Sequence, residues 1–287
     1  MNQNSRIFLL DKPVGISSFM ALDNLKQTFG TSKVGHVGTL DPFATGLLIA
    51  LSDKLTRATY LFSKMSKNYE SVIRFGAETN TLDVEGEIVA EAPLPDYHTI
   101  KRIVDNYTGS IIQTPPAFSA VKINGDRSYR LARKGLKVEL PKRTIRIHYF
   151  KVISWTPPDL RVSIRCSSGT YIRSLSRDVG IACGSRAFCY SLRRLSIGPF
   201  LVQNAVKPDL IDKSSGYDPV EFARIAQIPT ISLSNEVAGK LRMGVPLDRF
   251  ERWLPMIEEP TLCMSLDKEA LAMLDVKGGQ PAYRIVF

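Results

Sequence analysis

The alternation of hydrophobic and polar positions divides most of this chain into short strands and helices. Residues 47–51 form a continuous apolar run of strand length, whereas residues 67–75 and 160–166 alternate with a period of two. The first pattern indicates a buried strand, and the second indicates strands with one buried face. These elements follow no strict βαβ order. We therefore expect an α+β fold with a mixed, largely antiparallel central sheet flanked by helices and loops.

Helical spacing of apolar residues appears on both sides of these strands. Asp53 can cap a helix that runs to about Met65 and carries Arg57 on its outward face. After the strand at 160–166, a turn leads into a second helix, which has Tyr171 and Arg173 at its start. From spacing alone, Tyr171 and Arg173 are ordinary surface residues.

One loop isolates a single carboxylate among residues that shape the backbone. Residues 35–46 read GHVGTLDPFATG and place Asp41 directly before a proline. The glycines at 35, 38 and 46 can adopt conformations closed to other residues, and the proline keeps Asp41 extended. An Asp-Pro pair among glycines is usually a simple turn. A constrained loop beside a buried strand also suits catalysis, so both interpretations stay open from these residues.

The chain length and a linker-like stretch predict two domains. The 287 residues, 44% of them hydrophobic, can bury a full core. A linker-like stretch at 207–219 precedes a short helix at 220–226, and a small domain begins near Pro229. We expect domains at 1–228 and 229–287.

Net charge, the N-terminal stretch and the cysteines limit the kinds of partner, compartment and metal site that we expect. The formal net charge of +10 favours a polyanionic partner, although charge alone is weak support. The N-terminal apolar stretch is too short and too charged for a signal peptide or a membrane span, so we expect a cytoplasmic protein. The four cysteines form no Cys-x-x-Cys pair, and the three histidines are scattered. We expect buried free cysteines and no metal site.

The strongest local charge imbalance lies between residues 118 and 146. Asn124-Gly125 supplies a hairpin turn there, residues 128–134 can form a short helix, and Gly135 can end it. Only Asp126 and Glu139 offset the basic residues of this stretch. A solvated surface is the simpler explanation, but we favour an inserted RNA-binding projection. Its basic residues are Lys122, Arg127, Arg130, Arg133, Lys134, Lys137, Lys142, Arg143 and Arg146.

Six further motifs occur in the order of a known family. The Asp41 loop resembles the catalytic loop of the TruB family of pseudouridine synthases, which act on tRNA. The resemblance covers residues 8–199 and is carried by LDKPVGISS (10–18), KNY (67–69), TNTLD (79–83), TPPAFSAVK (114–122), SGTYIRSL (168–175) and LRR (192–194).

The resemblance implies roles for individual residues. Asp41 would be the essential catalytic aspartate, paired with Arg173, while Tyr69 would stack under the flipped uracil and is also open to a role in proton removal. Tyr171 would line the uridine pocket, and His36 would fill the vacated stack, unless it is only a loop histidine bonded to backbone. The basic projection would be the thumb that closes on the tRNA T arm. The remaining expected substrate-binding residues are Leu192, Arg57, Lys122, Arg130, Arg133 and Lys134.

The resemblance further implies a fold and a reaction. We expect a pseudouridine synthase fold followed by a small, mostly-β, PUA-like RNA-binding domain. The enzyme would isomerise uridine to pseudouridine at position 55 of tRNA, as a monomer, without cofactor or metal. The residues leave open whether a carboxylate attacks C1′, attacks C6 or acts through a glycal intermediate.

Two other function classes fit parts of the sequence. A noncatalytic RNA-binding protein would explain the basic stretch but would not require Asp41, Tyr69 and Arg173 together. A hydrolase with an aspartyl nucleophile would explain the loop, but Asp41 has no carboxylate neighbour between Asp23 and Asp53. A zinc deaminase is excluded by the missing His-x-Glu and Cys-x-x-Cys motifs.

Overall fold

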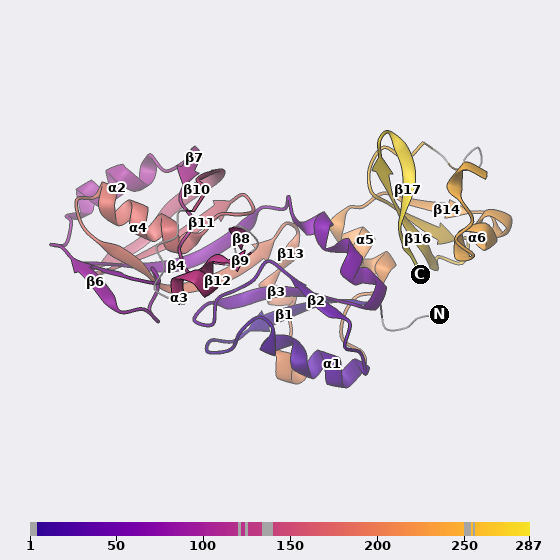
Figure 1. Cartoon of the computed structure of the whole chain (residues 1–287), viewed down its shortest axis with the longest axis horizontal. Helices are drawn as coiled ribbons and strands as arrows, with labels where there is room; N and C mark the ends of the chain where they lie inside the picture. Colours follow the sequence, from indigo (N-terminus) through magenta and orange to yellow (C-terminus); the bar gives the residue numbers. More distant parts are fainter. Residues whose placement is uncertain (1–4, 120–121, 124–125, 134–139, 250–253, 255) are drawn as a thin grey trace. The chain divides into compact units, whose positions relative to one another are not determined.

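The computed structural model describes residues 5–119, 122–123, 126–133, 140–249, 254 and 256–287 (Figure 1). The chain divides into two compact units. The first comprises Met1–Asp41, Gly46–Ser63 and Gly198–Phe287, and the second comprises Pro42–Thr45 and Lys64–Ile197.

The N-terminal part of the first unit is organised around the buried strand β3 (Thr45–Ser52). β1 (Ile7–Lys12) and β2 (Val34–Val37) both pair with β3 in antiparallel orientation. The 3-10 turn η1 (Met20–Leu22) and helix α1 (Asp23–Phe29) cover β1 and β3 with a shared apolar core. The apolar run at 47–51 is therefore a buried strand, as predicted.

The stretch predicted to be a linker is bonded to the first strand. Tyr217 exchanges two backbone hydrogen bonds with Ile7, and Val206, directly before the stretch, donates to the carbonyl of Leu9. Gly216 has φ +87°, and a Cβ there would lie 2.7 Å from the ring of Phe8. This stretch therefore packs on β1 and is not a free linker. It contains η4 (Pro208–Leu210), and β13 (Phe200–Leu201) and η3 (Val202–Asn204) precede it in the sequence.

The second unit contains an antiparallel sheet with β4 (Lys67–Phe75) between β11 (Asp159–Cys166) and β12 (Ala187–Ile197). β11 continues to β10 (Arg143–Thr156), which pairs with β7 (Gly109–Gln113). Helices α4 (Ile172–Ala182) and α2 (Tyr97–Asp105) pack on this sheet (Figure 1). Along β4 every second residue is buried, which confirms the predicted alternation.

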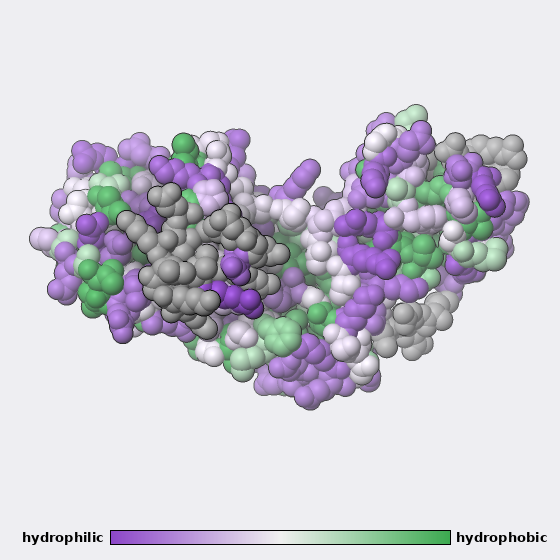
Figure 2. Space-filling view, viewed as in Figure 1, coloured by the Kyte–Doolittle hydropathy of each residue, from purple (hydrophilic) through white to green (hydrophobic). Residues whose placement is uncertain are grey.

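The second unit also contains two pairs of short strands. β5 (Ala77–Thr79) pairs with β6 (Ile88–Glu91), whose Ile88 and Val89 are exposed. Figure 2 shows apolar areas among the largely hydrophilic surface. β8 (Lys122–Ile123) pairs with β9 (Asp126–Arg127), and α3 (Ser128–Arg133) follows, as predicted for a short helix. The predicted turn at Asn124-Gly125 and the predicted helix end at Lys134-Gly135 lie outside the described residues.

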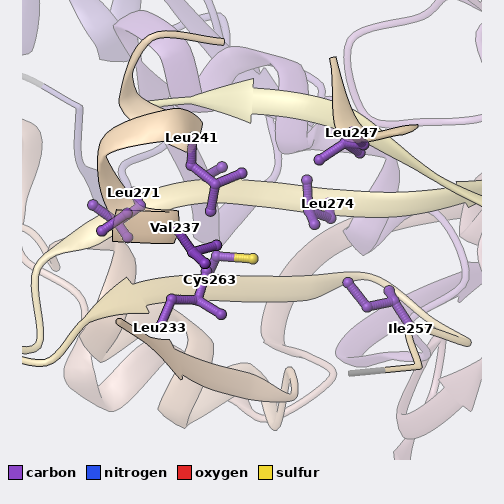
Figure 3. Close-up of a cluster of buried hydrophobic side chains, with 10 residues drawn as sticks. Leu233, Val237, Leu241, Leu247, Ile257, Cys263, Leu271 and Leu274 are labelled. Atoms are coloured by element: carbon purple, nitrogen blue, oxygen red, sulfur yellow. The ribbon is translucent and has the colours of Figure 1, made fainter. Parts of the chain in front are cut away.

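The C-terminal part is mostly β. β14 (Thr230–Leu233) runs parallel to β15 (Thr261–Ser265), and β16 (Ala270–Lys277) and β17 (Gln280–Val286) continue the sheet antiparallel. Helix α6 (Asn235–Arg242) and turn η5 (Leu247–Arg249) close its core, shown in Figure 3. α5 (Pro219–Ala226) precedes it and starts with a capping box formed by Asp218 and Glu221. The α+β class with a small, mostly-β C-terminal part is confirmed.

The helix predicted after β3 is present as the 3-10 helix η2 (Asp53–Phe62), and it ends before Met65. The prediction that Asp53 caps this helix was wrong. Asp53 has φ +48°, and its carboxylate accepts from the hydroxyl of Thr31 instead of from the helix. Arg57 is exposed on η2, as expected.

Candidate active site

The loop that carries Asp41 joins two paired strands. β2 ends at Val37, which is the register partner of Ile49 in β3, so the intervening residues return the chain through a closed loop. Gly38 has φ +63° and Gly46 has φ +97°, conformations that favour glycine and were predicted. The same expectation for Gly35 was wrong, because Gly35 lies inside β2 and pairs with Leu51.

A buried hydroxyl fixes the backbone directly before Asp41. Ser18 Oγ donates to the carbonyl of Leu40 and accepts from the amide of Leu40, both at 2.8 Å. That carbonyl belongs to the peptide bond between Leu40 and Asp41. The N-terminal motif therefore holds the Asp41 loop in place, a role that no sequence pattern assigned to Ser18.

The loop that presents Ser18 is itself closed by a buried lysine. Lys12 is fully buried, and its Nζ donates to the carbonyls of Pro13, at 2.9 Å, and Ile16, at 2.7 Å. These bonds satisfy two backbone groups and bind the ammonium group where water is excluded. The DKPVGISS sequence thus forms one hydrogen-bonded turn beneath the Asp41 loop.

Tyr69 lies on the buried face of β4 beside two cationic side chains. Its register partner on β12 is Arg194, which is buried, and Lys67 precedes it by two residues on the same face. Lys67 Nζ donates to the carbonyl of Met65 at 3.0 Å. Burial, reinforced by the charge of Arg194, lowers the pKa of Lys67 to about 8. This strand face therefore concentrates positive charge.

Arg173 is buried at the start of α4, and its guanidinium group bonds to Thr81, Asp83 and Phe118. Nη1 donates to Asp83 Oδ2 at 3.0 Å and to the carbonyl of Thr81 at 2.9 Å, and Nη2 donates to the carbonyl of Phe118 at 2.9 Å. The other Asp83 oxygen accepts from the Thr81 hydroxyl and from the amide of Glu85. The guanidinium group is thus held in one orientation.

Asp83, the partner of Arg173, is a further candidate site residue that the sequence did not single out. It stands in the TNTLD motif, to which no role was assigned. The general rule that a buried arginine requires an anionic partner is the signal that could have identified Asp83. The predicted pairing of Arg173 with Asp41 stays a prediction.

Tyr171 and Leu192 lie in the second unit with Tyr69 and Arg173. Tyr171 occupies the N-cap position of α4, and its amide and carbonyl both bond to the side chain of Gln113. Leu192 is buried on β12, and its carbonyl accepts from the Thr45 hydroxyl at 3.4 Å. His36 lies in β2 of the first unit, opposite Ala50 of β3.

The described residues of the predicted thumb are anchored through their backbone and Ser128. The buried Ser128 hydroxyl donates to the carbonyl of Ala117, and the amide of Tyr129 donates to the carbonyl of Ser119. Arg130 is exposed, and its Nε donates to the Tyr129 hydroxyl at 3.4 Å. Lys122 lies in β8 and Arg133 ends α3, whereas Lys134 lies outside the described residues.

The described part of the chain contains neither a candidate metal site nor a helix that could cross a membrane. Among the residues that the structure describes, no group of three or more His, Cys, Asp or Glu side chains could hold a metal ion. No helix within this described part is long and apolar enough to cross a membrane. All four cysteines are free; Cys183 is half-buried and the other three are buried, which largely matches the prediction.

Comparisons with known proteins agree with the motif analysis. Residues 26–172 match the family described as TruB family pseudouridylate synthase (N terminal domain). The tRNA pseudouridine synthase B of Bordetella avium is 40% identical over 209 residues, covering 71% of this chain and 86% of the relative. That of Aquifex aeolicus is 40% identical over 245 residues, covering 82% of this chain and 84% of the relative.

Solved structures share the fold at lower identity. A structure of an H/ACA RNP bound to a substrate RNA containing 2'-deoxyuridine aligns with a TM-score of 0.68 at 20% identity, covering 100% of this chain and 86% of the other. A Cbf5-Nop10-Gar1 complex aligns with a TM-score of 0.66 at 23% identity, covering 100% and 84%. The predicted pseudouridine synthase fold is thereby confirmed. The chain belongs to the TruB family of pseudouridylate synthases and is an isomerase.

Proposed function

We propose that this enzyme converts the T-loop uridine of tRNA, at position 55, to pseudouridine, with Asp41 as the catalytic carboxylate. The observation that carries the proposal is the position of Asp41 in a loop between β2 and β3, with the preceding peptide fixed by Ser18. A carboxylate whose backbone is held in advance can act on a substrate without first being ordered. The names of the bacterial relatives, tRNA pseudouridine synthase B, support tRNA as the substrate.

The reaction breaks the bond between C1′ and N1 of uridine and joins C1′ to C5 after the base has turned. C5 loses its proton, N1 gains one, and nothing is oxidised or consumed. Asp41 attacks carbon or stabilises the cationic sugar; attack at C1′, attack at C6 and a glycal intermediate all remain routes to test. Each route uses an ionised Asp41, which an adjacent arginine favours.

Arg173 is our candidate for that arginine. A guanidinium has five N–H donors, and Thr81, Asp83 and Phe118 are among the groups that accept from them. The bonds to these groups orient the planar fork, which suits it to present a further edge to Asp41. Tyr69 would stack under the uracil and assist removal of the C5 proton, and Leu192 and Tyr171 would complete the pocket.

The target base must leave its stack before Asp41 can reach it. Extrusion from a stacked loop costs a few kcal/mol, and one base–aromatic stack returns about 1–3 kcal/mol. Tyr69 and His36 would provide these contacts. The thumb at 118–146 and Arg57 would bind phosphates, and the region 229–287 would act as a PUA-like domain on other parts of the tRNA, beside a catalytic domain at 1–228.

Unmodified tRNA transcript tests the proposal directly. The purified protein is incubated with the transcript, and pseudouridine is mapped by chemical sequencing. We expect one product, at the T-loop uridine, and none with Asp41→Asn. A product confined to another position would overturn the assigned substrate site. Binding without any product would favour the noncatalytic RNA-binding alternative.

A further inference from the structure

Both peptide groups of Tyr171 are held by one buried side chain. Gln113, the last residue of β7, is fully buried. Its Oε1 accepts from the Tyr171 amide at 2.9 Å, and its Nε2 donates to the Tyr171 carbonyl at 3.0 Å. The same carbonyl accepts from the amide of Leu175 at 3.0 Å, the bond that opens α4. Both lone pairs of this carbonyl are therefore used, and the peptide cannot rotate without breaking a buried bond.

The ring of Tyr171 is held from the neighbouring strand. Arg143 is the register partner of Gln113 in the antiparallel pair of β10 and β7. Side chains of directly opposite residues leave the same face of such a pair, so both reach the same neighbour. The Arg143 guanidinium carbon lies 5.4 Å from the centroid of the Tyr171 ring, within cation–π range.

The loop before Tyr171 lies against the Arg143 side chain. Gly169 has φ +79°, and a Cβ at this position would lie 3.7 Å from Arg143 Nη1. The Arg143 guanidinium group therefore lies within van der Waals distance of this loop and within cation–π distance of the Tyr171 ring. One cross-strand pair thus acts on Tyr171 twice: Gln113 fixes the backbone, and Arg143 restricts rotation of the ring.

We propose that Gln113 and Arg143 are positioning residues that hold the Tyr171 ring in the orientation in which it contacts the target uridine. The inference rests on the proposed function, because it requires Tyr171 to line the substrate pocket. Gln113 also fixes the first turn of α4, which carries Arg173 two residues further on. If the contacts of Gln113 and Arg143 with Tyr171 were lost, the substrate would still bind, but the Tyr171 ring would be misaligned in the pocket.

Single-turnover kinetics on unmodified tRNA at saturating enzyme separate positioning from binding. Gln113→Met keeps the length of the side chain and removes both hydrogen bonds, and Arg143→Met removes the cation. We expect each to lower the rate of pseudouridine formation about ten- to hundredfold, the scale of a small misplacement in an active site. The Kd of Gln113→Met for tRNA should stay near that of the wild type.

Lys151→Met is the matched control. Lys151 lies on the same strand as Arg143, and its Nζ is 5.5 Å from the centroid of the Tyr149 ring. The control therefore also removes one positive charge and one cation–π contact on β10. The wild-type single-turnover rate is expected for Lys151→Met. An equal drop in rate for Lys151→Met and Arg143→Met would overturn the role of Arg143.

A double-mutant cycle with Tyr171→Ala distinguishes positioning from general structural support. If Gln113 acts through Tyr171, Gln113→Met should lower the rate much less in the Tyr171→Ala background than in the wild type. The same decrease in both backgrounds would overturn the proposal. Thermal unfolding reports folding, and if Gln113→Met does not fold, Arg143→Met at its half-buried position carries the cycle. A wild-type protein that makes no pseudouridine would overturn the proposed function instead.

Discussion

Arg173 and Asp83 form a buried ion pair that joins α4 to the turn between β5 and β6. Nη1 and Oδ2 are 3.0 Å apart, and the two side chains are only 6% and 4% exposed. The carbonyl of Phe118, at the start of the predicted thumb (118–146), accepts from the same guanidinium group. One side chain thus holds three segments that are distant in sequence, which makes the pair a structural centre of the second unit.

We predict that Asp83→Asn strongly destabilises the fold. The substitution leaves the Arg173 charge buried without its carboxylate, and breaking one partner of a buried pair costs about 3–5 kcal/mol. Urea denaturation measures the change. Asp159→Asn is the control, because it breaks the Arg74–Asp159 pair, in which both side chains are 32% exposed. We expect that control to be destabilised by about 1 kcal/mol or less, and equal destabilisation would contradict the prediction.

Ser18→Ala should impair turnover more than binding. The substitution leaves the buried amide and carbonyl of Leu40 without the Ser18 hydroxyl, which costs about 1–3 kcal/mol and frees the peptide before Asp41. Single-turnover rates and Kd for tRNA report the two effects separately. Ser17→Ala is the control, since within the described part of the chain the Ser17 hydroxyl accepts one exposed bond, from the amide of Met20. A Ser18→Ala variant with the wild-type rate would show that the bond is dispensable.

Periodicity predicted the elements because it reports local burial. The alternation along 67–75 predicted a strand with one buried face, and the spacing after 160–166 placed Arg173 at a helix start; the structure agrees with both predictions. Periodicity could not distinguish two kinds of helix that share the same spacing of apolar residues. Apolar residues three or four apart fit both an α-helix and a 3-10 helix, so the pattern after Asp53 could not separate them.

The supporting contacts of the site could not be predicted from the sequence. Ser18 bonds Leu40, Asp83 bonds Arg173 and Gln113 bonds Tyr171, across separations of 22, 90 and 58 residues. Such contacts arise from tertiary packing, which leaves no periodic signal. All of these residues lie in or beside the motifs that define the candidate site, but the motifs do not indicate these bonds.

Asp41→Asn should abolish isomerisation and leave tRNA affinity nearly intact. Asparagine keeps the size and much of the hydrogen-bonding shape of aspartate, but it is no carboxylate nucleophile. Pseudouridine mapping and a binding titration with the same tRNA measure the two properties. Turnover near the wild-type rate would show that the carboxylate of Asp41 is not required.

Lys67→Met should flatten the dependence of stability on pH between about 8 and 10.5. The pKa of Lys67 falls from 10.5 to about 8 in the folded protein. Between these values the unfolded chain holds the proton and the folded protein does not, so the free energy of unfolding of the wild type rises with pH. In the variant this slope should be smaller by up to about 1.4 kcal/mol per pH unit. Urea denaturation at several pH values measures it, and parallel wild-type and variant profiles would contradict the lowered pKa.

Neutralising Arg130, Arg133 and Lys134 together should weaken tRNA binding and reduce its salt dependence. Removing one phosphate interaction lowers the slope of log affinity against log salt by about 0.7 to 0.9, so removing three would take roughly 2 to 3 from the slope. Titrations at several salt concentrations measure it. The single-turnover rate at saturating enzyme should change much less than the affinity, because no proposed chemical step uses these residues.

The control for this variant must remove the same charge elsewhere. Lys101 and Arg102 on α2 and Lys151 on β10 are exposed and lie outside the basic stretch. Their joint replacement by glutamine changes the net charge equally. If long-range attraction alone governs binding, affinity and slope should fall alike in both triple variants. If the thumb binds phosphates directly, the slope should fall only in the variant at 130, 133 and 134, and that difference is the result we expect.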